Sequence, residues 1–181
     1  NQEIVITPAG KNKALLSIED LAWITIDNNI LKGSPSSERL MHLEVYKKVP
    51  EAKAIVHAHP PTAIAWSLAR PHMKELPTSA LPEIILAAGK IPVVPYARPG
   101  TLEMCTNIHP FIPNCRLMIL SRHGALCWGE SLTESANGIE RLEQVATILK
   151  LADELGGPID LPFAEIQALK ALRKKIGPRI I

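Results

Sequence analysis

The chain has 181 residues, 46% of them hydrophobic, which is enough to bury the core of one domain. Its 20 basic and 18 acidic residues leave a formal charge of +2, and aromatic residues make up 4%, so composition argues against a nucleic-acid partner. No apolar run reaches the roughly 18 residues that a membrane-spanning helix needs. The three cysteines match neither a zinc finger nor an even disulfide framework, and we interpret them as reduced thiols of a cytoplasmic protein.

Strand-like and helix-like hydrophobic patterns alternate along the chain. In the first half of the chain, the patterns predict a strand at 3–6, a helical turn at 17–20, a strand at 22–27, a helix of about a dozen residues ending near 49, a strand at 53–56 and a helix at 62–68. In the second half, they predict a strand at 91–95, a helix that begins at 100, and strands at 117–120 and 125–128. One helix is then predicted to begin at 132, and a last one to span 163–176. Ser131 and Glu134 have the spacing of a capping box. This alternation indicates one layered α/β domain over residues 1–181.

Two histidines stand at the end of a predicted strand. His57 and His59 directly follow the apolar run at 53–56, and two prolines end the strand after them. Residues i and i+2 of a strand point to the same face, so these imidazoles emerge side by side. His123 follows a second apolar run, at 117–120. We therefore predict a site of three neutral imidazoles with an open coordination position, a nitrogen-rich set that suits zinc and is typical of catalytic sites.

Two carboxylates are candidates for proton transfer. Glu38 opens a predicted helix and shares a face with His42, and it is either a glutamate stabilised by the helix dipole or a general base near the metal. Glu83 lies among apolar residues, so we expect it to be buried, either with a raised pKa that suits acid–base chemistry or paired with an arginine such as Arg98. Position alone leaves both alternatives open for each residue.

Two loops carry residues suited to binding an anion. Ser36 and Ser37 precede a predicted helix, whose free backbone N–H groups and dipole favour phosphate. Thr7 and Gly10 offer a second hydroxyl and a flexible turn. Each signal alone is weak, because such residues also cap helices and form turns.

Five short motifs occur together in a specific order. They are Thr-Pro-x-Gly at 7–10, Pro-Ser-Ser-Glu at 35–38, Val-His-Ala-His-Pro at 56–60, Pro-Tyr-Ala-x-x-Gly-Thr at 95–101 and Arg-His-Gly at 122–124. In this order and spacing they resemble the class II aldolase and adducin family, from about residue 3 to about residue 155. The resemblance implies a three-layer α/β/α fold with a mainly antiparallel central sheet, assembled as a homotetramer. It also implies retro-aldol cleavage of a phosphorylated keto-sugar to dihydroxyacetone phosphate and an aldehyde.

The same resemblance implies roles for individual residues. It implies a zinc ion bound by His57, His59 and His123. It assigns Glu38 as the acid/base that moves the carbon-bound proton. It implies that the substrate phosphate is bound by Ser36 and Ser37, helped by Thr7 and Gly10.

The chain departs from the family pattern in ways that leave alternatives open. The family's Gly-x-x-Gly-Asn-x-Ser segment, part of its phosphate site, has no counterpart here, so we expect the domain to lack an N-terminal segment. Glu83 stands where one aldolase of the family carries a tyrosine, and it is similar to the glutamate of the related methylthioribulose-1-phosphate dehydratases. A dehydratase or decarboxylase with Glu83 as acid/base is therefore an alternative, as is a non-catalytic adducin-like interaction module.

Overall fold

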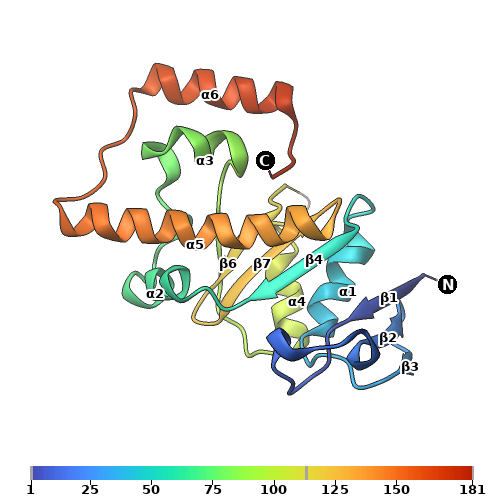
Figure 1. The fold of residues 1–181 in the computed structure, drawn as a ribbon. Helices are drawn as coiled ribbons and strands as arrows, with labels where there is room; N and C mark the ends of the chain where they lie inside the picture. The colour runs from blue at the N-terminus through green and yellow to red at the C-terminus, as the bar shows by residue number, and fades with distance from the viewer. Residues whose placement is uncertain (1, 113, 181) are drawn as a thin grey trace.

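A four-stranded sheet forms the centre of the computed structural model, which describes residues 2–112 and 114–180. Its strands, in spatial order, are β4 (Ala54–Ala58), β7 (Gly124–Gly129), β6 (Leu117–Leu120) and β5 (Val93–Val94) (Figure 1). The β4–β7 and β7–β6 pairs are antiparallel, and only the short β5–β6 pair is parallel. The predicted, mainly antiparallel central sheet is therefore confirmed.

Helices cover both faces of this sheet. One face carries α2 (Pro61–Ala69) and α5 (Leu132–Glu154), and the other carries α1 (Arg39–Lys48) and α4 (Leu102–Ile108). Alternate residues of β6 enter the two hydrophobic cores, so every residue of this strand is buried. A strand covered on both faces is expected to be a continuous apolar run, as this one is. The predicted three-layer α/β/α fold is confirmed.

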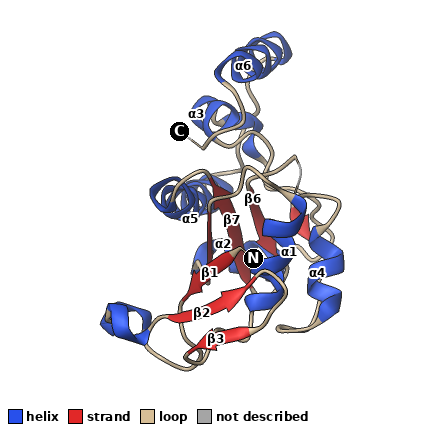
Figure 2. Cartoon of the chain, turned by 90° about the vertical axis from the view of Figure 1, so that its right-hand side faces the viewer, coloured by secondary structure: helices blue, strands red, loops and turns tan. Residues whose placement is uncertain are grey.

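A second, smaller sheet lies beside the first and packs on α1 (Figure 2). It contains the antiparallel strands β1 (Glu3–Ile6), β2 (Ala22–Thr25) and β3 (Ile30–Lys32). The 3₁₀ helices η1 (Lys13–Leu15) and η2 (Ile18–Asp20) join β1 to β2. Ile4, Ile24 and Leu43 of α1 form a small core that holds this sheet against the domain. The sequence pattern did not predict β3, because all three of its residues are exposed.

The helices α3 (Pro82–Ala87) and α6 (Phe163–Ile176) pack on each other above the central layers (Figure 1). Another 3₁₀ helix, η3 (Thr78–Ala80), leads into α3. The observed bounds of α6 are those predicted from its sequence, whereas α3 was not predicted. Among the described residues, no helix combines the length and apolar character that a bilayer span requires.

The chain after α6 turns back onto the central domain, where Ile180 is buried in the α2/α5 core. The carboxylate of Glu134 accepts hydrogen bonds from the backbone of Ile180 (2.9 Å) and from the guanidinium of Arg116 (2.8 Å). Arg116 also contacts Glu130, which in turn pairs with Arg179. The Ser131 hydroxyl caps α5 as predicted, but Glu134 contributes to this tail-binding network instead of closing the capping box.

Candidate metal centre and active-site cavity

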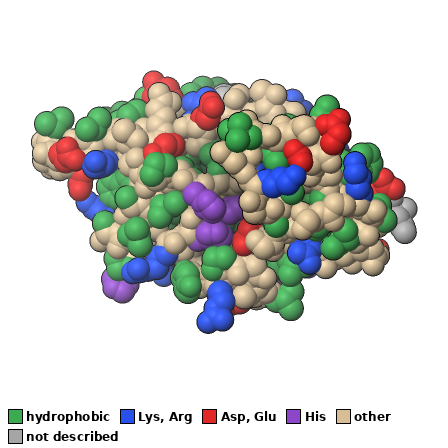
Figure 3. Space-filling view, turned by 60° about the horizontal axis from the view of Figure 1, so that its bottom comes forward, with side chains coloured by type: hydrophobic (Ala, Val, Ile, Leu, Met, Phe, Trp, Pro, Cys, Tyr) green, Lys and Arg blue, Asp and Glu red, His purple; other side chains and the backbone are tan. Residues whose placement is uncertain are grey.

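Three histidines meet at one end of the central sheet, where β4 ends and the β6–β7 turn begins. The imidazole centroids of His57, His59 and His123 lie 4.9–5.2 Å from one another. One ligand nitrogen from each ring lies within 4.8 Å of those of the others, which is a spacing that a single cation can bridge. Histidine side chains gather near the middle of one molecular face (Figure 3). The structure thus brings together the three predicted ligands from sequence positions about 65 residues apart.

The strand period explains the placement of the first two ligands. His57 and His59 share a face of β4 with Ile55, which packs in the same core as Met41 of α1. Because β4 is paired with β7 along its length, with His57 opposite Leu126, the direction of the His57 ring is determined by the sheet, and His59 follows directly after the last paired residue, Ala58. This face looks toward α1, which follows Glu38 in the chain.

The third ligand depends on a turn held by a buried serine. Arg122 has a φ of 60°, which is uncommon for a residue with a side chain. Its backbone N–H donates to the hydroxyl of Ser67 on α2 at 2.9 Å, and Ser67 is 1% exposed. The N–H of His123 donates to Leu120 at 3.0 Å, which closes the turn. Ser67 therefore positions the turn that presents His123.

The nitrogen of His57 that faces away from the cluster is already occupied. The Nδ1 of His57 lies 2.9 Å from the carbonyl oxygen of Ala125, so this nitrogen carries the proton and Nε2 is left with a free lone pair. Within the described part of the chain, His57 Nε2 and His123 Nδ1 are buried and have no hydrogen-bond partner. Burial lowers the pKa of His57 to about 3 and also lowers the pKa of His123. Neutral rings with buried, unpartnered nitrogens are a donor set that fits a divalent metal ion.

Gly124 provides the space in which the rings meet. A Cβ atom at this position would lie 2.5 Å from the carbonyl oxygen of Ala58, 2.8 Å from Cδ2 of His59 and 3.1 Å from Cε1 of His57. Any side chain would therefore displace two candidate ligands. The Arg-His-Gly motif thus has a steric explanation that the sequence alone did not supply.

Glu38 lies beside the histidines, immediately before the first residue of α1. Among the described residues, its Oε2 atom is buried without a hydrogen-bond partner. Both residues line the same cavity, and the negative charge of Glu38 opposes the effect of burial on the pKa of His123. The Ser36 hydroxyl accepts a hydrogen bond from the Glu38 N–H at 3.2 Å. This bond positions the backbone from which the Glu38 side chain extends. A buried carboxylate with a free oxygen next to a metal site is suited to accept or donate a proton.

The two predicted anion-binding loops lie side by side. The N–H of Ser36 donates to Thr7 at 3.1 Å and the N–H of Ala9 donates to Ser34 at 3.0 Å. A cavity of about 680 Å³ is lined by Thr7, Gly10, Ser36, Ser37, Glu38 and the three histidines, among others. This volume is in the range typical of small-molecule sites. One cavity is therefore lined both by the candidate metal ligands and by a pair of hydroxyl-bearing loops.

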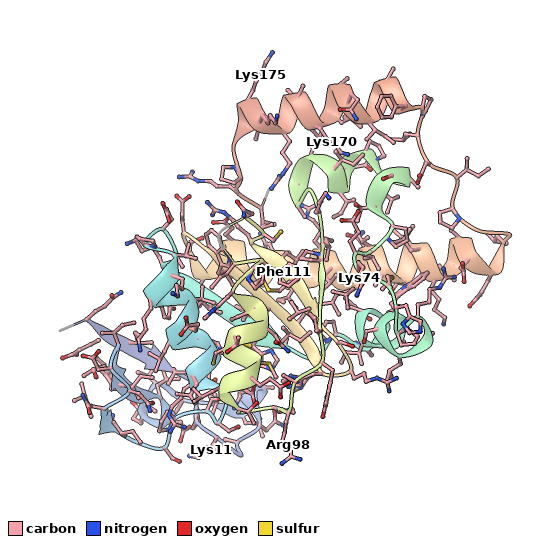
Figure 4. All side chains as sticks on the ribbon, turned by 180° about the vertical axis from the view of Figure 1, so that it is seen from behind. Lys11, Lys74, Arg98, Phe111, Lys170 and Lys175 are labelled. Atoms are coloured by element: carbon pink, nitrogen blue, oxygen red, sulfur yellow. The ribbon has the colours of Figure 1, made fainter. Side chains whose placement is uncertain are left out.

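Glu83 is not part of this cavity. It lies exposed near the start of α3, in a separate cavity of about 340 Å³ that it shares with Arg141 of α5. The expectation that Glu83 is buried was wrong, because the apolar neighbours Ile84 and Ile85 turn into the cores and leave the glutamate on the outer face of a short helix. In Figure 4, Arg98 lies at the end of the molecule opposite α3, so it is not the partner of Glu83 either.

The sequence patterns did not identify three residues near the site as functional candidates. Lys13 and His42 line the cavity, and burial lowers the pKa of His42 to about 4. The carboxylate of Glu143 on α5 accepts hydrogen bonds from Thr62 N–H at 2.9 and 3.0 Å, so it caps α2 three residues after His59. The i+4 spacing of Glu38 and His42 was a usable signal, whereas nothing local marks Lys13 or Glu143.

Comparisons with known proteins agree with this geometry. A sequence profile described as the class II aldolase and adducin N-terminal domain matches residues 1–149. An L-fuculose phosphate aldolase from Methanococcus maripaludis is 36% identical over 153 residues, which cover 84% of this chain and 81% of that protein. A 3-oxo-tetronate 4-phosphate decarboxylase from Escherichia coli is 32% identical over 152 residues, covering 81% of this chain and 70% of that protein. A solved structure of L-fuculose 1-phosphate aldolase superposes with a TM-score of 0.84 at 31% identity, covering 96% of this chain and 81% of that chain.

Proposed function

Because the chain belongs to the class II aldolase and adducin family, we propose that it is a zinc-dependent carbon–carbon lyase that cleaves a phosphorylated keto-sugar by a retro-aldol reaction. The products would be dihydroxyacetone phosphate and an aldehyde. The observation that carries this proposal is the single cavity in which three histidines, a carboxylate with a buried oxygen and two hydroxyl-bearing loops lie together.

The three histidines would hold the metal. The buried, unpartnered nitrogens of His57 and His123 and the more exposed ring of His59 leave one side of the cluster open to the cavity. A zinc ion bound there would supply a Lewis acid for the negative charge that develops on the substrate oxygens. The Ala125 carbonyl holds His57 in the tautomer that coordination requires.

The remaining residues position the substrate and move a proton. The hydroxyls of Ser36, Ser37 and Thr7, with the backbone at Gly10, would bind the phosphate in the same cavity as the metal. Retro-aldol cleavage removes the proton from the hydroxyl that becomes the aldehyde carbonyl and adds a proton to the carbon that is left behind. Glu38 would accept the first proton, directly or through water, and deliver it to that carbon, so that the proton count balances. Its free oxygen and its position next to His123 support this role.

A decarboxylase is the second candidate, because a relative that is 32% identical is a 3-oxo-tetronate 4-phosphate decarboxylase. The same cavity would then expel carbon dioxide in place of an aldehyde. Glu83 was predicted as a second acid/base, but in one chain it lies outside the cavity. It can act only if assembly, for which we propose a homotetramer, brings it to the site of a neighbouring chain.

Product identification tests the proposal. The zinc-loaded protein is incubated with a set of phosphorylated ketoses and with 3-oxo-tetronate 4-phosphate. Dihydroxyacetone phosphate together with an aldehyde supports retro-aldol cleavage, and carbon dioxide supports the second candidate. Failure to bind about one zinc per chain would overturn both candidates and favour a non-catalytic, adducin-like module.

Substitution of Glu38 tests the proton-transfer step separately. Glu38→Gln keeps the shape of the side chain, so zinc should stay bound while turnover falls by about 10²–10⁴-fold. Glu44→Gln is the matched control, since Glu44 lies on α1, the helix that Glu38 precedes, but pairs with His109 outside the cavity. Full activity of Glu38→Gln would refute the role given to this residue.

A further inference from the structure

Lys13 places a positive charge at the hydroxyl-bearing end of the cavity. Among the described residues that line the cavity, it is the only lysine or arginine, and Glu38 is the only acid. The ammonium group of Lys13 is therefore the protein's own cation for any anionic ligand in this space.

The ammonium is held over the loop that was predicted to bind phosphate. Asn12 caps η1 by accepting a hydrogen bond from the N–H of Ala14 at 3.0 Å, which sets the direction of Lys13. The Nζ atom of Lys13 donates to the carbonyl of Pro8, within the Thr7–Gly10 loop, and to the carbonyl of Lys11 at 3.4 Å. An ammonium group has three N–H donors, so one donor remains for a ligand after these two bonds.

We infer that Lys13 is a specificity residue that selects phosphorylated ligands by contacting the phosphate bound at the Thr7/Ser36/Ser37 end of the cavity. This inference rests on the proposed function. A phosphate monoester carries nearly two negative charges at neutral pH, and it would share the cavity with the Glu38 carboxylate. Hydroxyl and amide donors can orient a phosphate but do not neutralise it, whereas a charge-assisted hydrogen bond from lysine does both. An unphosphorylated sugar gains nothing from this contact.

The test measures ligand binding by isothermal titration calorimetry and does not need turnover. Inorganic phosphate is titrated into the zinc-loaded full chain, its Lys13→Met variant and its Lys11→Met variant. Lys11 is the matched control, because it lies two residues earlier, is exposed as Lys13 is, pairs with Asp20 and is not among the residues lining the cavity (Figure 4). We expect Lys13→Met to weaken phosphate binding by about tenfold, because it removes one partly screened, charge-assisted hydrogen bond. Lys11→Met should keep the phosphate affinity within about twofold of that of the wild type.

Further measurements separate this inference from the proposed function. Lys13→Arg should restore most of the phosphate affinity, and the three variants should bind dihydroxyacetone equally. The inference is overturned if wild-type protein does not bind phosphate, if Lys13→Met binds it as wild type does, or if Lys11→Met weakens binding equally. If phosphate binding depends on Lys13 but no phosphorylated substrate is turned over, the proposed reaction fails while this inference stands.

Discussion

Replacing Gly124 with alanine should damage the metal centre more than its small size suggests. The added Cβ would lie 2.5 Å from the Ala58 carbonyl oxygen, a backbone atom, and within 3.1 Å of ring carbons of His57 and His59. The carbonyl cannot easily recede, because Ala58 is held in register with Ala125 across the β4–β7 pair. The strain must therefore be relieved by shifting the rings or by separating the strands.

This clash should lower both the stability of the fold and the affinity for zinc. Insertion of one methyl into a close-packed region costs about 1–3 kcal/mol, which for a chain of this size corresponds to a melting temperature lower by roughly 2–12 °C. Displacement of two ligand rings should weaken zinc binding by at least about tenfold, in the range seen when groups that orient metal ligands are lost. Competition for zinc with a chromophoric chelator measures the affinity, and thermal unfolding followed by circular dichroism measures the stability.

Gly138→Ala is the matched control for overpacking away from the site. Its Cβ would lie 2.4 Å from Sγ of Cys127, on the α5 face of the sheet, and the clash is partly offset by about 1 kcal/mol of improved helix propensity. This variant should lose stability without losing zinc affinity. Wild-type zinc affinity in Gly124→Ala, or an equal loss in Gly138→Ala, would show that Gly124 does not provide the space for the rings.

Two other predictions concern the supports of the fold. Glu143→Ala removes the acceptor for the first amides of α2 and should cost about 0.5–2 kcal/mol, measured by urea unfolding, whereas Glu140→Ala on the exposed face of α5 should cost little. The hydrogen bonds from Arg179 and Arg116 lower the pKa of Glu130 from 4.5 to about 2. Since a lowered pKa means stability that is lost as pH falls, the difference in melting temperature between wild type and Glu130→Gln should be full above about pH 5, shrink as the pH falls through the folded pKa of about 2, and vanish below it. A difference that does not shrink between pH 5 and pH 2 would contradict this assignment.

Local sequence patterns were sufficient to predict most helices and strands of the central layers. The run at 117–120 predicted β6 because a strand covered on both faces must be apolar throughout. The hydrophobic stripe after Ser131 predicted α5, and the amphipathic pattern at 163–176 predicted α6 with its observed ends. The short elements β3 and α3 were missed because three to six residues contain too little of either period to be distinguished from a loop.

The pairing of His57 and His59 was determined by the sequence itself, since the two-residue period of a strand puts both rings on one face wherever the strand lies. The tertiary structure decided what depends on distant contacts: the third ring at the β6–β7 turn, the free oxygen of Glu38, the space at Gly124 and the charge of Lys13. It also moved Glu83 to the surface, because burial depends on which helix face meets the core and not on how apolar the neighbours are. Periodicity is a local property that one segment encodes, whereas clearance, burial and charge in a cavity are sums over segments that meet only after the chain has folded.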